Sequence, residues 1–204
     1  MTIVIRREPP ENFTSYGTVP VAFAVSRVLD VEERGERFTF TERAIEPSFL
    51  KDYDAIPEND PANWPRRFSI ANWGLFSARD GESWVGAAAI APRGTDVLSP
   101  DVGLDAAVLW DIRVAPANRG KSVGRTLFAA AERWASGAHR RWLIAETQNV
   151  NVAACRFYER TGCELVRMDR RVYPEFPDEV RLVWRKQVRL PASHESLPRR
   201  ADTG

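Results

Sequence analysis

Residues Val108–Gly124 read VLWDIRVAPANRGKSVG, and this stretch decides the fold of the chain. Its first half is an apolar run that predicts a strand buried on both faces. Ala115-Pro116-Ala117-Asn118 ends the strand, because proline lacks an amide donor and asparagine favours turns. Arg119–Gly124 then leads into a helical pattern. A loop of small residues before a helix leaves backbone N–H groups unpaired and favours an anion such as pyrophosphate. The alternative is an ordinary strand-to-helix turn with exposed cations.

The composition predicts one globular domain that binds neither nucleic acid nor a membrane. The 204 residues are 44% hydrophobic and 28% charged, and the formal net charge of +1 gives no basic field for such partners. We expect no signal peptide, because the first ten residues lack a long apolar segment. Cys155 and Cys163 suit reduced thiols, and no Cys/His spacing indicates a zinc site. We therefore expect a cytoplasmic protein without a metal.

The first 67 residues predict a variable part with a loose start and one β-hairpin. Residues 1–19 are polar and contain prolines, so we expect a lead-in with at most a brief strand at Ile3–Arg6. Val19–Val31 and Arg37–Arg43 alternate apolar and polar residues and predict the hairpin. Prolines and scattered acids follow, which predicts a short helix near Ser48–Tyr53 and then a loop.

Residues 68–188 predict an α/β (α+β) core with a mixed sheet, in which antiparallel strands precede a short parallel section. The helix after the anion loop forms a crossover, so the strand that follows it lies parallel to the central strand. We expect residues 1–188 to form a single domain, a loop at 92–103 and a disordered tail at 189–204. The other expected elements are strands over Phe68–Ala78, Ser83–Ala91, Arg141–Thr147, Glu164–Val172 and Glu179–Gln187, a helix from Val123 ended by Ser136-Gly137, and a helix over Asn151–Arg160.

Two motifs in order resemble those of the GCN5-related N-acetyltransferase (GNAT) superfamily. RGKSVG at 119–124 resembles its pyrophosphate-binding signature, Arg/Gln-x-x-Gly-x-Gly/Ala. Asn151-x-x-Ala154-x-x-x-Tyr158-x-x-x-Gly162 resembles its later motif, with a strand between the two. The segments WDIRV at 110–114, ETQNVN at 146–151 and YPEFP at 173–177 are similar to the streptothricin acetyltransferase group.

The resemblance implies a GNAT fold and an acetyl-CoA-dependent N-acetyltransferase whose cofactor lies along the central strand and the anion loop. Strand backbone would pair with the pantetheine arm of acetyl-CoA. Ser122 departs from the family signature, which has glycine there. A positive φ would cost serine about 1–2 kcal/mol, and without one its hydroxyl can add a phosphate contact. The expected cofactor-binding residues are Ile112, Arg113, Val114, Arg119, Gly120, Lys121, Ser122, Val123, Gly124, Asn151, Ala154 and Tyr158.

Three side chains are candidates for the proton transfers that acetylation of an amine requires. Asp111 and Glu146 are acids within apolar strands, and an unpaired buried carboxylate is costly, so each is a candidate base or substrate clamp. A structural ion pair of Asp111 with Arg113 or Arg141 is the alternative. Tyr158 is the candidate acid for the leaving thiolate, and a ring that only packs in the core is its alternative.

The expected acceptor is a primary amine of a small cationic molecule. The turn from Tyr173 to Glu179 combines acids with aromatic residues and would border the mouth of the site, and Trp64, Trp73 and Trp110 would line it. The resemblance implies streptothricin, an antibiotic that acetylation of its β-lysine amine would inactivate. A peptide or protein amine stays open, as do a homodimer and a non-catalytic acyl-CoA-binding regulatory module.

Overall fold

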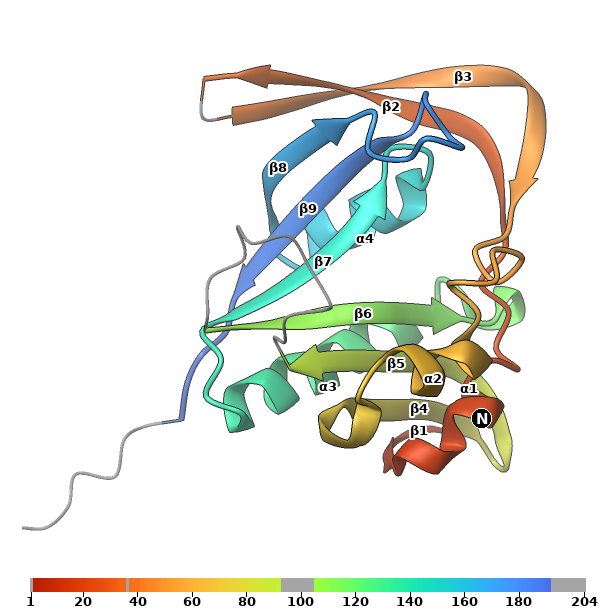
Figure 1. The fold of residues 1–204 in the computed structure, drawn as a ribbon, viewed down its shortest axis with the longest axis vertical. Coiled ribbons are helices and arrows are strands. Elements are labelled where there is room, and N and C mark those ends of the chain that lie inside the picture. Colours follow the sequence, from red (N-terminus) through yellow and green to blue (C-terminus); the bar gives the residue numbers. More distant parts are fainter. Residues whose placement is uncertain (1, 36, 93–104, 192–204) are drawn as a thin grey trace, which may run out of the picture.

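A seven-stranded mixed sheet forms the centre of the molecule, with the strand order β1-β4-β5-β6-β7-β9-β8 (Figure 1). The computed structural model describes residues 2–35, 37–92 and 105–191, so the expected loop at 92–103 and the tail lie almost wholly outside the described residues. Every pairing is antiparallel except that of β6 with β7, which confirms the mixed sheet. The strands are β1 (Ile3–Glu8), β4 (Gly74–Asp80), β5 (Ser83–Pro92), β6 (Ala106–Val114), β7 (Trp142–Gln148), β8 (Glu164–Arg170) and β9 (Val180–Gln187).

The parallel pair β6–β7 is short, and the two strands diverge toward their C-terminal ends (Figure 1). They pair only from Ala106 opposite Trp142 to Leu109 opposite Ala145. Beyond that point β6 remains paired with β5 and β7 with β9. One edge of β6 from Trp110 onward therefore has no strand partner among the described residues.

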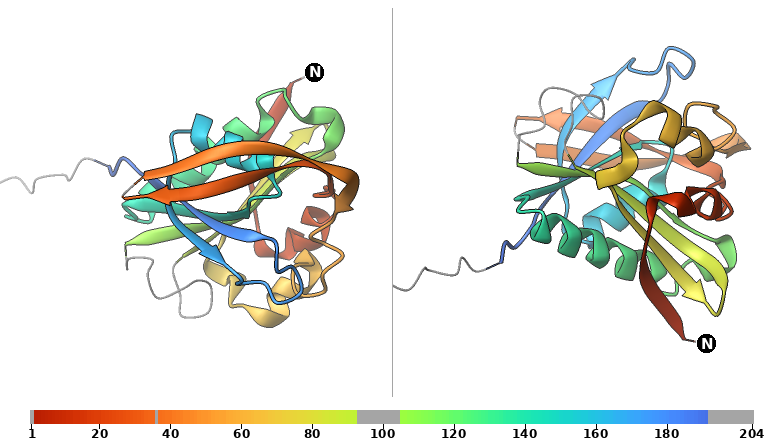
Figure 2. Two further views of the ribbon diagram at one scale, coloured as in Figure 1. Left: turned by 90° about the horizontal axis from the view of Figure 1, so that it is seen from above. Right: turned by 60° about the horizontal axis from the view of Figure 1, so that its bottom comes forward.

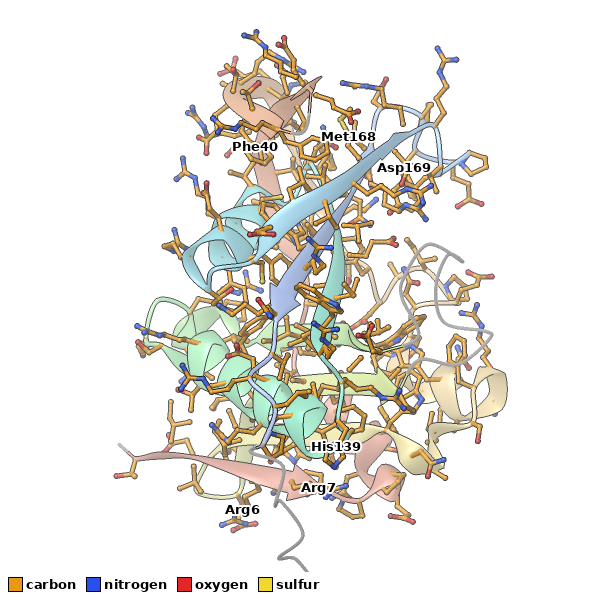
Figure 3. The ribbon with its side chains drawn as sticks, turned by 90° about the vertical axis from the view of Figure 1, so that its left-hand side faces the viewer. Arg6, Arg7, Phe40, His139, Met168 and Asp169 are labelled. Atoms are coloured by element: carbon orange, nitrogen blue, oxygen red, sulfur yellow. The ribbon has the colours of Figure 1, made fainter. Side chains whose placement is uncertain are left out.

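Two helices, both predicted from the sequence, cover one face of the sheet. Helix α3 (Val123–Gly137) and helix α4 (Val152–Arg160) place their apolar side chains in one core with the central strands. Asn151 caps α4 by accepting the N–H of Ala154 at 3.1 Å. Helix α3 ends at Gly137, as expected, and a residue with a left-handed backbone, His139 with φ 54°, follows two positions later (Figure 3).

An aromatic core covers the opposite face, and it corrects the expectation of a loose N-terminus. Phe13 and Tyr16, of the short helix α1 (Phe13–Tyr16), are 2% and 0% exposed, and Val19 is 0% exposed. They pack with Trp64 of helix α2 (Trp64–Arg67) and with residues of β4, β5 and β6. Short 3₁₀ helices at Pro10–Asn12, Pro61–Asn63, Ile70–Asn72 and Pro116–Asn118 join these elements.

The hairpin of β2 (Phe23–Arg34) and β3 (Arg37–Lys51) forms a separate two-stranded sheet that arches over the β7–β9–β8 side (Figures 1 and 2). The expected helix near Ser48–Tyr53 is wrong. The register shifts around Pro47, after which Phe49 and Lys51 pair again with β2. An edge strand accommodates proline at such an irregularity, so prolines here did not mark the end of the strand. The expected strand over Phe68–Ala78 begins only at Gly74.

Candidate active site

A cavity of about 480 Å³ lies where β6 and β7 diverge. Its wall combines these two strands with the start of α3, helix α4 and two segments of the N-terminal part. Gly120, Lys121, Ser122 and Val123 of the expected site are not in this wall, although they lie beside it in the chain. The expected site residues in the wall are Asp111, Ile112, Arg113, Val114, Arg119, Gly124, Glu146, Asn151, Ala154 and Tyr158.

A β-bulge in β6 shapes the floor of the cavity. Ala89 of β5 lies opposite Asp111 and the next residue lies opposite Leu109, so Trp110 is an additional residue. Trp110 packs into the aromatic core, with ring centroids 6.1 Å from Trp64 and 5.6 Å from Trp73. Trp64 and Trp110 line the cavity as expected, whereas Trp73 packs behind it.

The loop before α3 has the backbone conformation of an anion site. Gly120 and Ser122 have φ values of 74° and 65°, so Ser122 adopts the left-handed conformation that costs serine about 1–2 kcal/mol. The first amide groups of α3 have no acceptor within the helix. A Cβ at Gly124 would lie 3.4 Å from the Phe157 ring, so a larger side chain there would fill the cavity wall. The loop, the unpaired edge of β6 and the cavity together fit an extended ligand that carries amides and a diphosphate.

The Arg119 side chain holds this loop in place through two hydrogen bonds. Its Nε donates to the carbonyl of Val114 at 3.0 Å, and its Nη2 donates to the carbonyl of Ala22 at 3.1 Å. The guanidinium therefore links the end of β6 to the chain that precedes β2.

Tyr158 both packs in the core and reaches the cavity. Its side chain is 5% exposed, and its ring lies between Phe157 and Trp184 at centroid distances of 5.4 and 6.0 Å. Burial, with a smaller contribution from Asp111, raises the pKa of Tyr158 well above its ordinary value. Its hydroxyl has no hydrogen-bond partner among the described residues, so no neighbouring group there takes its proton.

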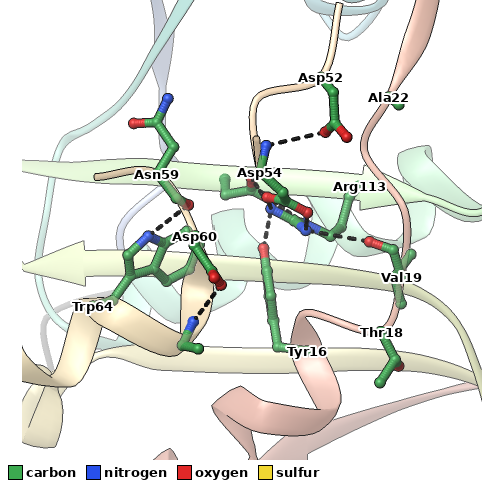
Figure 4. Close-up of polar contacts among 12 residues, drawn as sticks. Tyr16, Thr18, Val19, Ala22, Asp52, Asp54, Asn59, Asp60, Trp64 and Arg113 are labelled. Atoms are coloured by element: carbon green, nitrogen blue, oxygen red, sulfur yellow. Dashed lines mark hydrogen bonds and ion pairs between the residues drawn. The ribbon is translucent and has the colours of Figure 1, made fainter. Parts of the chain in front are cut away.

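Arg113 lies at the centre of a buried polar network (Figure 4). Its side chain is 1% exposed, and its five N–H bonds are all used. Nε and Nη2 donate to Asp111 at 2.9 and 2.8 Å, Nη1 and Nη2 donate to Asp54 at 2.7 and 3.1 Å, and Nη1 also donates to the carbonyl of Val19. The Tyr16 hydroxyl donates to Asp111 at 2.6 Å. With three hydrogen bonds on its carboxylate, Asp111 has the expected alternative role, a structural ion pair with Arg113.

Glu146 stands at the end of a chain of hydrogen bonds that runs in one direction. The Tyr53 hydroxyl donates to Gln148 Oε1 at 2.5 Å, Gln148 Nε2 donates to the Tyr173 hydroxyl at 2.8 Å, and that hydroxyl donates to Glu146 Oε1 at 2.7 Å. The nearest cation to Glu146 Oε2 is Arg181, at 3.9 Å. Glu146 lines the cavity with 29% of its side chain exposed. Of the two candidate bases, Glu146 is thus the carboxylate with an oxygen still free of close donors.

The turn after β8 lies elsewhere than expected. None of residues 173–179 lines the cavity, and the Tyr173 hydroxyl connects the turn to Gln148 and Glu146 of the wall. Glu179 accepts a hydrogen bond from Lys51 at 2.6 Å in a buried ion pair, and the Lys51 ammonium lies 3.4 Å from the centroid of the Phe176 ring. These contacts fasten the turn to the end of β3.

The sequence analysis missed three side chains that line or support the cavity. Tyr16, Tyr53 and Asp54 come from the part of the chain that carries no motif, and no local pattern marks them. The position of Gln148 could have been predicted. It follows Glu146 by two residues in one strand, so the two side chains lie on the same face of the sheet. Cys155 and Cys163 are buried free thiols as expected, and burial raises the pKa of Cys155 to about 12.

Comparison with known proteins assigns the family. Residues 38–163 match the model of the acetyltransferase (GNAT) family. This chain belongs to that family. The acetyltransferase is 27% identical over 165 residues to streptothricin acetyltransferase from Escherichia coli, which covers 79% of this chain and 83% of that protein. It is 36% identical over 80 residues to streptothricin acetyltransferase A from Bacillus subtilis (strain 168), which covers 38% of this chain and only 46% of that relative's own length.

Solved structures confirm the GNAT fold. A protein from Bacillus anthracis str. Ames that was assigned as a streptothricin acetyltransferase, solved in complex with acetyl coenzyme A, superposes with a TM-score of 0.73 at 24% identity, over 93% of this acetyltransferase and 99% of that chain. A nourseothricin acetyltransferase superposes with a TM-score of 0.70 at 22% identity, over 93% and 100%. Within the part that the structure describes, no helix of the acetyltransferase has the length and apolar character needed to cross a membrane.

Proposed function

We propose that this acetyltransferase transfers the acetyl group of acetyl-CoA to a primary amine of a small cationic molecule, and that streptothricin is the acceptor. One observation carries the proposal. The Glu146 carboxylate and the Tyr158 hydroxyl, a proton acceptor and a proton donor, line one cavity at the divergence of β6 and β7. The relatives named streptothricin acetyltransferase support the choice of acceptor.

Backbone groups would hold acetyl-CoA, which supplies the acetyl group as a thioester when bound. The unpaired edge of β6 at Ile112–Val114 would pair with its amide-bearing arm. The loop from Arg119 to Gly124, with Gly120, Lys121, Ser122 and Val123, would bind the diphosphate through amide groups at the start of α3. Asn151 and Ala154 would complete the wall from α4.

Glu146 would make the acceptor nucleophilic. An alkyl ammonium with a pKa of about 10.4 is less than about one part in a thousand neutral at pH 7, so a base that takes its proton raises the rate. As the carbon–nitrogen bond forms and the carbon–sulfur bond breaks, Tyr158 would give its proton to the sulfur. The second proton of the amine nitrogen would pass to the Tyr158 phenolate, directly or through water, and Glu146 would release the first proton to water, so that both groups are restored and one proton is released for each acetyl group transferred. Asp111 would not act as the base. It would keep the Arg113 side chain, and with it the floor of the cavity, in position.

The test is to incubate the protein with acetyl-CoA and streptothricin, follow the release of free CoA and measure the product mass. We expect a gain of one acetyl group. Glu146→Gln should lower kcat by about 10²-fold while acetyl-CoA binding is unchanged, because only proton acceptance is lost. Glu164→Gln, at a site with 75% of the side chain exposed, is the matched control and should behave like the wild type.

Other outcomes would contradict parts of the proposal. Acetylation of a peptide or another amine, without streptothricin, would replace the acceptor and keep the enzyme. Binding of acetyl-CoA without transfer to any amine would favour a non-catalytic regulatory module. An unchanged kcat in Glu146→Gln would remove Glu146 as the base.

A further inference from the structure

The carboxylates around the cavity differ in how fully their charge is compensated. Asp54 and Asp111 share a single cation, Arg113, and no other cation contacts either of them among the described residues. That cluster carries a net charge of −1. Glu146 belongs to a second cluster, in which, among the described residues, the carboxylates of Glu146 and Asp169 face the two guanidinium groups of Arg181 and Arg167. The uncompensated negative charge of the cavity wall therefore lies at the Arg113 cluster.

Within that cluster, Asp54 is the group that can accept a further donor. A carboxylate offers about four lone-pair positions. Asp111 uses three of them, for two bonds from Arg113 and one from Tyr16, whereas Asp54 uses two. Asp54 is also the more exposed of the pair, at 24% against 17% of the side chain, and it lines the cavity. Burial raises the pKa of Asp54, because the carboxylate has lost contacts with water, and the contacts to Arg113 oppose that rise.

The chain around Asp54 is anchored on both walls of the cavity. Asp54 itself reaches Arg113 on β6, while the preceding residue, Tyr53, donates to Gln148 on β7. The Asp54 N–H donates to Asp52 Oδ1 at 3.1 Å, which fixes the backbone. Asp54 and Glu146 thus face one cavity from different elements. The remaining cation in the wall, Arg119, is engaged by carbonyls at the end of β6.

We propose that Asp54 binds a second ammonium group of the acceptor, so that the enzyme selects molecules with two cationic nitrogens. The nitrogen at Asp54 keeps its proton and anchors the molecule. The other nitrogen lies at Glu146 and is acetylated. This inference rests on the proposed function for the role of Glu146, and it adds the residue that determines specificity.

The experiment compares isosteric pairs of amines by direct binding in the presence of CoA. The probes are α,ω-diamines with three to six carbons, each matched to the monoamine in which a methyl group replaces the second nitrogen. For at least one pair, we expect the wild-type Kd to be about tenfold or more lower for the diamine, because a hydrogen bond to a charged group is lost in the monoamine. Since titration calorimetry measures binding alone, the result does not depend on turnover.

Asp54→Asn should bring the ratio of the two Kd values close to one. The asparagine oxygen still accepts from Arg113, and the Arg113–Asp111 pair becomes neutral, so the variant is expected to fold. Asp54→Glu keeps the charge and should keep a preference for diamines. Glu58→Gln removes a charge from the same segment at an exposed position outside the cavity wall, and should leave the ratio unchanged.

The wild type keeps the test decisive if Asp54→Asn does not fold, because two carboxylates at fixed positions should make the preference depend on the length of the diamine. Equal binding of both amines in every pair would overturn the inference. So would a preference for diamines that survives in Asp54→Asn or that is the same at every chain length. If the preference is found but streptothricin is not acetylated, the proposed acceptor fails while the Asp54 site stands.

Discussion

The two ends of the cavity are built in different ways. The proposed cofactor end consists of neighbouring residues of one stretch, the end of β6, a loop and the start of α3, and it presents mostly backbone groups. The proposed acceptor end consists of side chains that meet from distant segments: Tyr16 contacts Asp111 across 95 positions, and Asp54 contacts Arg113 across 59. A site made of local backbone can be recognised from a motif, whereas a site made of distant side chains can change its ligand without changing the motif.

The difference between the two ends predicts how strongly the stability of the protein depends on one side chain. The largest loss of stability is expected at the acceptor end. Arg113→Ala would leave two poorly exposed carboxylates without their cation, so the free energy of unfolding should fall by about 3–5 kcal/mol. Arg119→Ala, at the cofactor end, removes an exposed side chain with bonds to two carbonyls and should cost about 1 kcal/mol. Urea denaturation measures both variants. Equal losses would show that the two ends do not differ in this respect.

The next effect concerns chemistry at the cofactor end. Tyr158→Phe removes only a hydroxyl, so the Kd for acetyl-CoA should stay within about twofold while kcat falls by about 10²-fold, the lower range for a general acid that water can partly replace. Binding titrations and initial rates separate the two quantities. Glu164→Gln, the exposed control used above, should leave both quantities unchanged. A kcat of Tyr158→Phe equal to that of the wild type would reduce Tyr158 to a core residue.

The smallest predicted effect is a change in stability at the cofactor end. It tests whether the side chain of Ser122 contributes to the loop or only its backbone does. Ser122 is exposed and left-handed, and its side chain does not cap α3. Ser122→Gly should relieve the strain and raise stability by about 0.5–1 kcal/mol, after the greater freedom of glycine in the unfolded chain is counted. The melting temperature should then rise by about 2 °C. A lower melting temperature would show that the Ser122 hydroxyl has a stabilising contact.

The same difference explains what the sequence could predict. The order of strands and helices after residue 74 and the cap at Asn151 follow from neighbours in the chain, whereas the sequence left the sign of φ at Ser122 open. The burial of Tyr16 and the extension of β3 to Lys51 do not, because partners far along the chain decide them: Asp111 and Arg113 for Tyr16, and β2 for Lys51. The site residues, the domain limits, the absence of a metal, the oligomeric state and the location in the cell stay predictions.

The contacts of Arg113 have a consequence for attempts to shorten this enzyme. The segment that matches the family model begins at residue 38, yet Tyr16 and the carbonyl of Val19 lie before it. A protein that began at residue 38 would keep every family motif and lose part of the support of its acceptor end. It would also lose β1, which leaves β4 as an uncovered sheet edge and invites self-association. The shortest soluble, selective form of this acetyltransferase therefore has to include the N-terminal strand and helix α1.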